Sequence, residues 1–225
     1  VALCMDRAGL SGDDGPTHHG LFDIAYLRTV PNIIHMQPKD EDEFVDMLWT
    51  IAHHHNGPMA IRYPRGAGTG VKPKKEPRLL EIGKAEVVRH GTQVAIFGLG
   101  NFCQIAEETA ALLEKEGISA AVINPRWIKP LDTTTIEFFA RSVDVICTME
   151  DHALANGFGC GIMEHLSEAH ITTPVVRVGW PDLFIEHGSV PILREKYGLT
   201  AKAAVEKILP FIRSRAAVEV PHNAA

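Results

Sequence analysis

The sequence predicts an α/β protein made of two consecutive units. Short apolar runs typical of strands alternate with segments whose apolar residues recur at helical spacing, which is the pattern of parallel βαβ units. Residues 67–78 interrupt this alternation with glycine, proline and lysine and indicate a linker. We therefore expect domains over residues 1–66 and 79–215, followed by a flexible tail over residues 216–225.

The composition is that of an ordinary globular protein and argues against two classes of partner. Of the 225 residues, 45% are hydrophobic and 22% are charged, and the net charge of −6 offers no basic surface for nucleic acid. Apolar runs such as Gln93–Leu99 are too short to cross a bilayer. We therefore expect neither a nucleic-acid partner nor a membrane span.

The four cysteines are Cys4, Cys103, Cys147 and Cys160, which lie far apart with no Cys-x-x-Cys pair. This spacing favours reduced cysteines in the core over a disulfide or a metal site. No metal ligands are predicted.

The first unit begins directly on an apolar run, Val1–Met5, which predicts a buried strand. The chain has no starting methionine and no lead-in before this strand, so we expect it to be cut from something longer. Asp40 can cap a helix with an acidic first turn, and apolar residues then recur at helical spacing as far as Ile51. The other predicted elements are a helix at Leu21–Arg28 and strands at Asn32–Met36 and Met59–Tyr63.

The second unit repeats the alternation of strand and helix. Its predicted strands are Ala85–Val88, Gln93–Gly98, Ala120–Ile123, Val143–Met149 and Val175–Val178. Its predicted helices are Phe102–Glu116, Thr133–Ala140, Gly159–Ala169 and Ala201–Ile212.

The loop over residues 6–20 carries the strongest chemical signal. Its four glycines allow tight turns and a close approach of the backbone to a ligand. Arg7 offers a guanidinium group suited to phosphate, and His18 can exchange protons near neutral pH. Asp14 can accept hydrogen bonds or orient a neighbour. The residues alone fit a solvated loop with an exposed histidine equally well.

A second signal is Arg-Tyr-Pro-Arg-Gly, residues 62–66, at the end of a predicted strand. Pro64 stiffens the turn, so Arg65 is expected at the same sheet edge as the first loop. Two arginines from separate strand ends would suit a phosphate monoester. Taken alone, Arg65 is better interpreted as a surface arginine paired with a helix carboxylate than as a phosphate ligand.

Three further motifs are expected to be structural. The run His53–His55 precedes Asn-Gly and is typical of a solvated helix end rather than a metal site. Gly98–Cys103 lacks the third glycine of a dinucleotide-binding loop and predicts a tight turn. Glu150–His152 follows a predicted strand, where we expect a packing role.

Together these motifs resemble a known family. Gly-x-Asp-Gly-Pro-Thr-His, residues 12–18, resembles the histidine-bearing loop of transketolases. Residues 6–20 with residues 62–66 are similar to the 1-deoxy-D-xylulose-5-phosphate synthases, transketolase-like enzymes that use thiamine diphosphate. Supporting matches lie at residues 22–28, 38–41, 122–132 and 179–184, and the resemblance covers residues 1–213. It implies part of a parallel-sheet pyrimidine-binding domain followed by a transketolase C-terminal α/β domain.

The resemblance also implies a reaction and its site. Such enzymes are transferases that condense pyruvate with D-glyceraldehyde 3-phosphate, with loss of CO₂, in the biosynthesis of isoprenoids, thiamine and pyridoxal. By this resemblance Arg7 and Arg65 bind the phosphate of the acceptor, and Asp14 and His18 contact its hydroxyl and carbonyl groups and assist proton transfer.

The family motifs that hold thiamine diphosphate and Mg²⁺ belong upstream of Val1. We therefore assign no cofactor-binding residue to this chain and expect it to be inactive alone. The resemblance implies a homodimer in the bacterial cytoplasm, with a plastid location left open. The alternatives are a transketolase, the beta subunit of a 2-oxo-acid dehydrogenase, or a non-catalytic assembly module.

Overall fold

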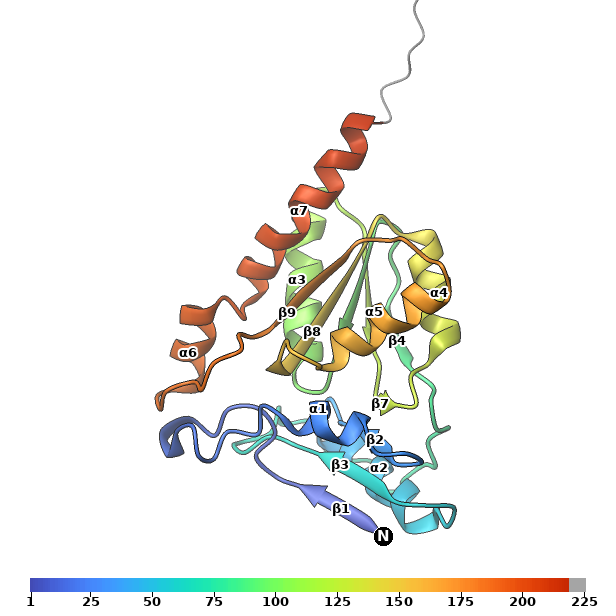
Figure 1. The fold of residues 1–225 in the computed structure, drawn as a ribbon, viewed down its shortest axis with the longest axis vertical. Helices are drawn as coiled ribbons and strands as arrows, with labels where there is room; N and C mark the ends of the chain where they lie inside the picture. The colour runs from blue at the N-terminus through green and yellow to red at the C-terminus, as the bar shows by residue number, and fades with distance from the viewer. Residues whose placement is uncertain (219–225) are drawn as a thin grey trace, which may run out of the picture.

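The computed structural model describes residues 1–218, which form two stacked units (Figure 1). The first unit contains β1 (Ala2–Met5), the 3₁₀ turn η1 (Gly12–Asp14), α1 (Asp23–Arg28), β2 (Ile34–Met36), α2 (Glu41–His53) and β3 (Met59–Arg62). As predicted, Asp40 caps α2, where its carboxylate accepts the Glu43 N–H at 2.8 Å.

The sheet of the first unit has the strand order β1-β3-β2-β7. Strands β1 and β2 both run parallel to β3, as the alternation of strand and helix predicted. The fourth strand, β7 (Trp127–Lys129), comes from the second half of the chain and pairs antiparallel to β2. Trp127 is buried in the core of this unit, beside Met36, Met47 and Ile61. The first unit is therefore completed by residues far along the sequence.

Strand β1 is present, but the prediction that it is buried is wrong. Val1 is 93% exposed and Leu3 is 41% exposed. The strand lies at the edge of its sheet and pairs only with β3. An apolar run shows that a segment can be a strand, but it does not show which surface covers it.

The second unit is a five-stranded sheet with helices on both faces (Figure 1). Its strands are β4 (Glu86–Arg89), β5 (Val94–Gly98), β6 (Ala120–Asn124), β8 (Val145–Ala153) and β9 (Val175–Trp180). Its helices are α3 (Phe102–Lys115), α4 (Thr133–Ser142), α5 (Phe158–Glu168), α6 (Val190–Tyr197) and α7 (Ala201–Val218). The strand order is β4-β6-β5-β8-β9, with β4 antiparallel to β6 and the other pairs parallel.

Residues in β5 show why this sheet is covered on both faces. Val94 and Ile96 pack with α3 and α7, whereas Ala95 and Phe97 pack with α4 and α5. Successive side chains of a strand point to opposite faces, so an uninterrupted apolar run requires a layer on each side. The run in β5 thus specifies a three-layer α/β unit.

Several predicted boundaries differ from the structure. Strand β8 continues to Ala153, so Glu150–His152 lies inside a buried strand and not after it. Helix α7 reaches Val218, three residues into the expected tail, and residues 219–225 lie outside the described part of the chain. All four cysteines are free, but Cys4 is exposed, so the prediction of a core position is wrong for it.

No helix or strand occurs between β3 and β4, where the linker was predicted. This segment is nevertheless attached to α2, because the Arg78 N–H donates to Asp46 at 2.7 Å and Lys74 pairs with Asp42 at 2.9 Å. Within the described residues, no helix has the length and hydropathy required to cross a membrane.

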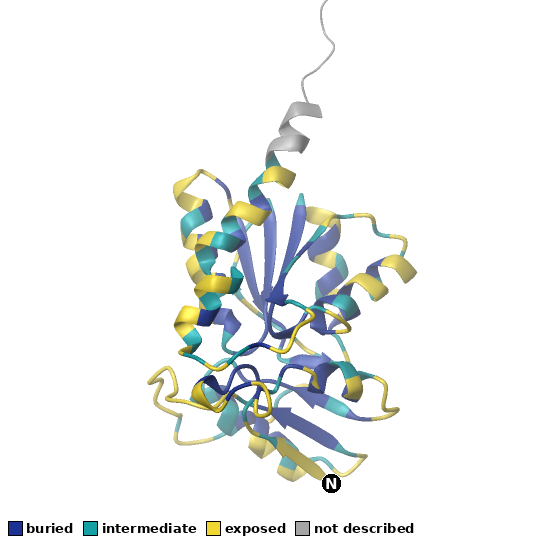
Figure 2. Cartoon of the chain, turned by 60° about the vertical axis from the view of Figure 1, so that its left-hand side comes forward, coloured by how far each residue is buried: buried dark blue, intermediate teal, exposed yellow. Residues whose placement is uncertain are grey.

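Buried residues are found in both sheets and where the two units meet (Figure 2). Ile24 of α1 belongs to the core cluster that contains Phe97 and Ile162 of the second unit. Arg62, at the end of β3, is fully buried and donates to Asp23 at 2.7 and 3.1 Å and to the Asp151 carbonyl at 3.1 Å. An apolar contact and a buried ionic network therefore join the two units.

Candidate functional site: the arginine–aspartate cluster

The loop over residues 6–20 is closed at its base by paired backbone hydrogen bonds. Gly9 N–H donates to the Gly20 carbonyl at 2.9 Å, and Gly20 N–H donates back at 2.8 Å. A Cβ atom at Gly20 would lie 2.3 Å from the Arg7 carbonyl oxygen, so only glycine allows this closure. The closed base leaves the segment from Ser11 to His18 as a compact loop of the Ω type.

Arg7, Asp14 and Arg65 meet at this loop. The Asp14 carboxylate lies 3.4 Å from the Arg7 guanidinium group and pairs with the Arg65 guanidinium group. The three side chains are between 30% and 50% exposed, so a small ligand can reach them. Arg7 also has a φ of 62°, an uncommon conformation for a residue other than glycine. The partner of Arg65 is thus Asp14, the last residue of η1 within the loop.

His18 lies at the end of the same loop, two residues before Gly20, and is exposed. Its Nδ1 lies 2.9 Å from the Thr17 hydroxyl, and its carbonyl oxygen accepts the Ser11 hydroxyl at 2.7 Å. The backbone of His18 is therefore fixed, while its ring is open to solvent, a combination suited to exchanging protons with a bound molecule.

A cavity of about 200 Å³ adjoins the base of the loop. It is lined by Met5, Asp6, Ala8, His19, Gly20, Phe22, Asp23 and Tyr26. Burial raises the pKa of Tyr26, and the nearby Asp23 carboxylate raises it further. The cavity and the cluster are neighbours, because Asp6 lines the cavity and lies 3.9 Å from Arg7.

Asp23 and Arg62 form a buried pair that the sequence reasoning missed. Burial acts to raise the pKa of the Asp23 carboxyl, but the Arg62 guanidinium group outweighs it and lowers that pKa. Arg62 belongs to the same Arg-Tyr-Pro-Arg-Gly motif as Arg65, yet the two arginines differ completely in exposure. The sequence did contain one signal of a buried ion pair: Arg62 is the last residue of a strand that is otherwise apolar.

Three titratable groups are buried around this junction. Burial lowers the pKa of His35 to about 3 and that of His152 to about 4. Burial raises the pKa of Glu150 to about 7, although Phe158 and Gly159 donate N–H groups to it at 2.6 and 2.9 Å. His152 is fully buried, in keeping with the packing role expected for it.

The remaining candidate motifs fall in structural positions. His53 is the last residue of α2, and its Nδ1 lies 2.8 Å from the Trp49 carbonyl, as a helix end predicts. Gly100 has a φ of 59° in the tight turn before α3. In the part of the chain that is described, no three His, Cys, Asp or Glu side chains are grouped so that they could hold a metal ion.

Comparison with known proteins agrees with this architecture. Residues 1–69 match the model of the transketolase pyrimidine-binding domain, and residues 83–203 match that of the transketolase C-terminal domain. A 1-deoxy-D-xylulose-5-phosphate synthase of Methylacidiphilum infernorum is 61% identical over 95% of the chain, and one of Acidobacterium capsulatum is 54% identical over 98%. The chain spans only 34% and 35% of the length of these two relatives.

Solved structures give the same result for the fold. A protein described as a split-gene transketolase, an inactive beta4 tetramer, superimposes with a TM-score of 0.81 at 32% identity, covering 95% of this chain and 66% of that one. The transketolase of Campylobacter jejuni superimposes with a TM-score of 0.67 at 19% identity, covering 93% of this chain and 31% of that one, and shares the fold alone. With two family domains in consecutive order and relatives that share one name, the chain belongs to the transketolase family and closely resembles its 1-deoxy-D-xylulose-5-phosphate synthase members.

Proposed function

We propose that this chain supplies the acceptor-binding part of a 1-deoxy-D-xylulose-5-phosphate synthase. In that role it would bind D-glyceraldehyde 3-phosphate for condensation with pyruvate. The names of its relatives support the reaction, and the cluster of Arg7, Asp14 and Arg65 supports the acceptor site. The observation that carries the proposal is that two guanidinium groups from separate strand ends converge on one carboxylate.

The chemistry of the cluster suits a phosphorylated aldehyde. A phosphate dianion can take the place of the Asp14 carboxylate between the two guanidinium groups, which match its geometry. Asp14 is then free to accept a hydrogen bond from the acceptor hydroxyl. The aldehyde oxygen must gain a proton as the new carbon–carbon bond forms, and we assign the exposed His18 to supply it.

The family uses thiamine diphosphate, which when bound would supply carbanion chemistry for the condensation. The described residues offer no grouped metal ligands for the Mg²⁺ ion expected with its diphosphate. We propose that the residues that hold the cofactor and the metal lie outside this chain. We propose that the chain alone does not turn over, and that the whole protein works in the bacterial cytoplasm in isoprenoid, thiamine and pyridoxal biosynthesis.

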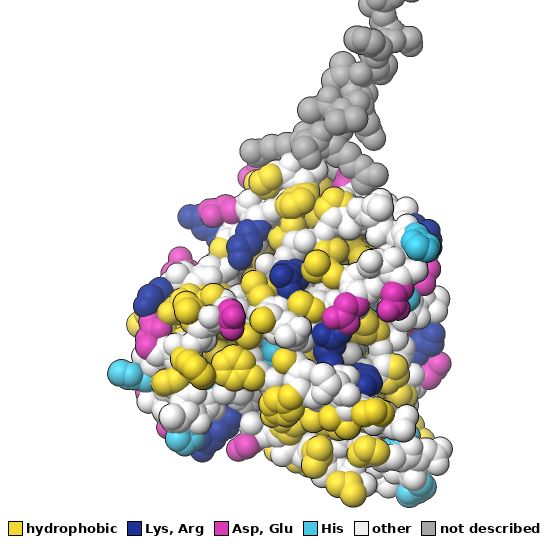
Figure 3. Space-filling view, viewed as in Figure 1, with side chains coloured by type: hydrophobic (Ala, Val, Ile, Leu, Met, Phe, Trp, Pro, Cys, Tyr) yellow, Lys and Arg dark blue, Asp and Glu magenta, His cyan; other side chains and the backbone are white. Residues whose placement is uncertain are grey.

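A role in assembly is the second candidate, and exposed apolar side chains favour it. Phe184 is 81% exposed and Tyr26 is 56% exposed, and hydrophobic side chains gather on one face over the first unit and the junction (Figure 3). Patches of this kind mark protein contacts. The split-gene relative is itself described as an inactive tetramer. We propose that this face supports a homodimer, whether or not the chain takes part in catalysis.

Calorimetric titration of the chain with D-glyceraldehyde 3-phosphate tests the acceptor site. Removing a charged hydrogen-bond donor costs about 1.5–3 kcal/mol, so Arg7→Met and Arg65→Met should each weaken binding by about tenfold or more. Arg141→Met, which removes an exposed arginine paired only with Glu137 on α4, is the matched control and should change nothing. Binding that survives loss of both cluster arginines would sink the proposal.

Two further measurements separate the alternatives. A synthase releases product from pyruvate and glyceraldehyde 3-phosphate, whereas a transketolase uses a ketose donor, so assays with each donor distinguish the two. Clear turnover of either kind by this chain would contradict its proposed inactivity. Sedimentation with and without thiamine diphosphate tests the assembly role, which requires dimers that form regardless of the cofactor.

A further inference from the structure

The loop that carries Asp14 and His18 is anchored in the second unit. Leu10 and Leu21, which flank the loop, are 3% and 1% exposed. Both belong to the core cluster built on β5 and β8, together with Phe102 and Trp180. The loop therefore belongs to the first unit in sequence, but the second unit provides the packing that holds it.

His19 links the inside of the loop to the second unit through both ring nitrogens. The Ser11 N–H donates to Nδ1 at 3.0 Å, and Nε2 lies 3.3 Å from the Glu186 carbonyl oxygen. A carbonyl can only accept, so Nε2 carries the proton and Nδ1 holds the lone pair. The ring is 8% exposed and makes both contacts from a fixed position. His18, one residue earlier, is exposed instead.

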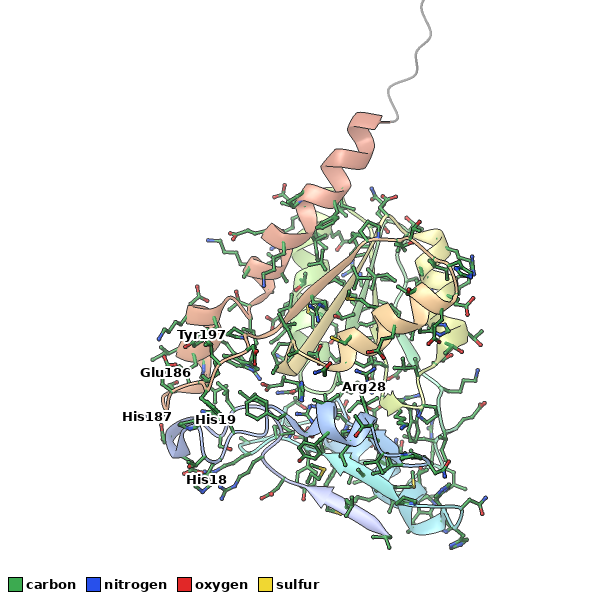
Figure 4. The ribbon with its side chains drawn as sticks, viewed as in Figure 1. His18, His19, Arg28, Glu186, His187 and Tyr197 are labelled. Carbon is green, nitrogen blue, oxygen red and sulfur yellow. The ribbon has the colours of Figure 1, made fainter. Side chains whose placement is uncertain are left out.

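The Glu186 end of this link is itself held by α6. The Glu186 carboxylate accepts the Tyr197 hydroxyl at 2.7 Å and pairs with Lys196. Tyr197 packs edge-on against Trp180 of β9, with the ring centroids 5.7 Å apart. Figure 4 shows His19, Glu186 and Tyr197 following one another from the loop toward α6.

A second contact ties the same two segments together. The Gly188 N–H donates at 3.2 Å to the carbonyl of Gly12, the first residue of η1. A Cβ atom at Gly15 would lie 3.2 Å from the Cβ of His187, so the turn after Asp14 fits closely against this segment. Residues 186–188 thus contact the loop on both sides of Asp14.

We propose that His19 is a positioning residue, through which the second unit sets the geometry of the Asp14 and His18 loop. The ring bridges the Ser11 N–H and the Glu186 carbonyl, and α6 fixes Glu186 from behind. This inference rests on the proposed function for its effect on the acceptor, since the loop would present Asp14 and His18 to glyceraldehyde 3-phosphate. The positioning itself is a property of the chain without ligand.

Amide hydrogen exchange of the chain without ligand tests the positioning. His19→Leu removes both contacts and should speed exchange at residues 12–18 by about tenfold, the change expected for about 1.4 kcal/mol of lost local stability. His19→Asn can keep an acceptor for Ser11 but cannot reach Glu186, and His19→Gln can reach Glu186 but leaves Ser11 unpaired. Both should fall between the wild type and His19→Leu. If His19→Leu leaves exchange at residues 12–18 unchanged, the proposal is wrong.

Tyr197→Phe tests the same link from a distance. It removes the hydroxyl that donates to the Glu186 carboxylate, so faster exchange at residues 12–18 would show that α6 acts on the loop through residues 186–188. The control region is β5, whose exchange should stay at the wild-type rate in every variant.

Nitrogen NMR of the His19 ring should show a protonated Nε2 and an unprotonated Nδ1, and the opposite tautomer would overturn the assignment.

Titration of the same variants with glyceraldehyde 3-phosphate connects the inference to function. His19→Leu and Tyr197→Phe should weaken acceptor binding in the order of their effects on exchange. If the wild-type chain fails to bind the acceptor, the proposed function fails, while the exchange data still decide whether His19 positions the loop. If exchange rises but acceptor binding does not change, His19 positions the loop, and the proposed effect of this positioning on the acceptor is wrong.

Discussion

Asp14 lies between two guanidinium groups and neutralises part of their charge. In the absence of ligand it keeps Arg7 and Arg65 close together, although like charges repel. An incoming phosphate must compete with this carboxylate for the same donors. The residue therefore both assembles the candidate anion site and limits its affinity.

Replacing Asp14 by asparagine should tighten the binding of inorganic phosphate. One negative charge about 4 Å from the anion costs about 1 kcal/mol in a water-like medium, so its removal should lower the dissociation constant about fivefold. Asp13→Asn, the matched control, removes the same charge from a residue outside the arginine pair. Calorimetric titration with phosphate at fixed ionic strength measures both. Equal tightening by the two variants would mean that only net charge matters.

The sequence was sufficient to bring three of the site residues together. Arg7 and Asp14 follow β1 and Arg65 follows β3, and the carboxyl ends of these two parallel strands share an edge of the sheet. The motif at residues 12–18 singled out His18, but nothing in the sequence indicated that the adjacent His19 is buried and contacts Ser11 and Glu186. The role of Arg62 was also hidden, since its partners come from α1 and β8.

At the scale of elements, Asp132 performs two tasks at the start of α4. Its carboxylate accepts the Thr135 N–H at 3.1 Å, which caps the helix, and the Ala85 N–H at 2.9 Å, which fixes the chain before β4. Burial acts to raise the pKa of Asp132, but these donors outweigh it and lower that pKa. Asp132 thus connects the start of α4 to the residue that precedes the edge strand β4.

Asp132→Ala should lower the free energy of unfolding by about 2 kcal/mol. A lost helix cap costs about 1 kcal/mol, and a buried N–H without an acceptor costs at least as much. Asp132→Asn keeps one acceptor oxygen and should lose about half as much. Urea denaturation followed by circular dichroism measures both changes. A loss as large for asparagine as for alanine would assign the effect to charge and not to capping.

Most elements were predicted from their apolar patterns, even the three-residue strand β2, but the short elements β7 and α6 were missed. Strand β5 and helix α3 were recognised because their patterns run for several residues. Strand β7 has only three residues between two prolines, and α6 begins on Val-Pro with little amphipathic pattern. Both are stabilised by tertiary contacts, which a local pattern does not record.

At the scale of the whole molecule, the buried ionisable groups should make stability depend on pH between 4.5 and 6.5. The ordinary pKa of 6.5 for His35 and His152 falls to about 3 and about 4 on folding, so the unfolded chain binds two more protons there. Glu150 changes in the opposite direction, from 4.5 to about 7, so the folded chain binds one more proton. Unfolding should therefore take up about one proton, and stability should rise by about 1.4 kcal/mol per pH unit.

Glu150→Gln removes the opposing group. The pH dependence over the same range should then become about twice as steep, because two histidines still take up protons on unfolding. Chemical denaturation at intervals of half a pH unit provides the two slopes. An unchanged slope in the glutamine variant would mean that Glu150 does not bind its proton in the folded chain.

Strand β7 connects the two units, because this segment from the second half of the chain is the fourth strand of the first unit's sheet. Cleavage of the backbone within residues 67–78 would therefore not divide the protein in two. The pieces should remain associated as a complementing pair, which migrates as one species under native conditions and as two after denaturation. Residues 1–66 produced alone would have a truncated sheet with an open edge beside β2 and would be prone to association. Because β7 belongs to both, we expect the two units of the described chain to fold together and not as separable domains.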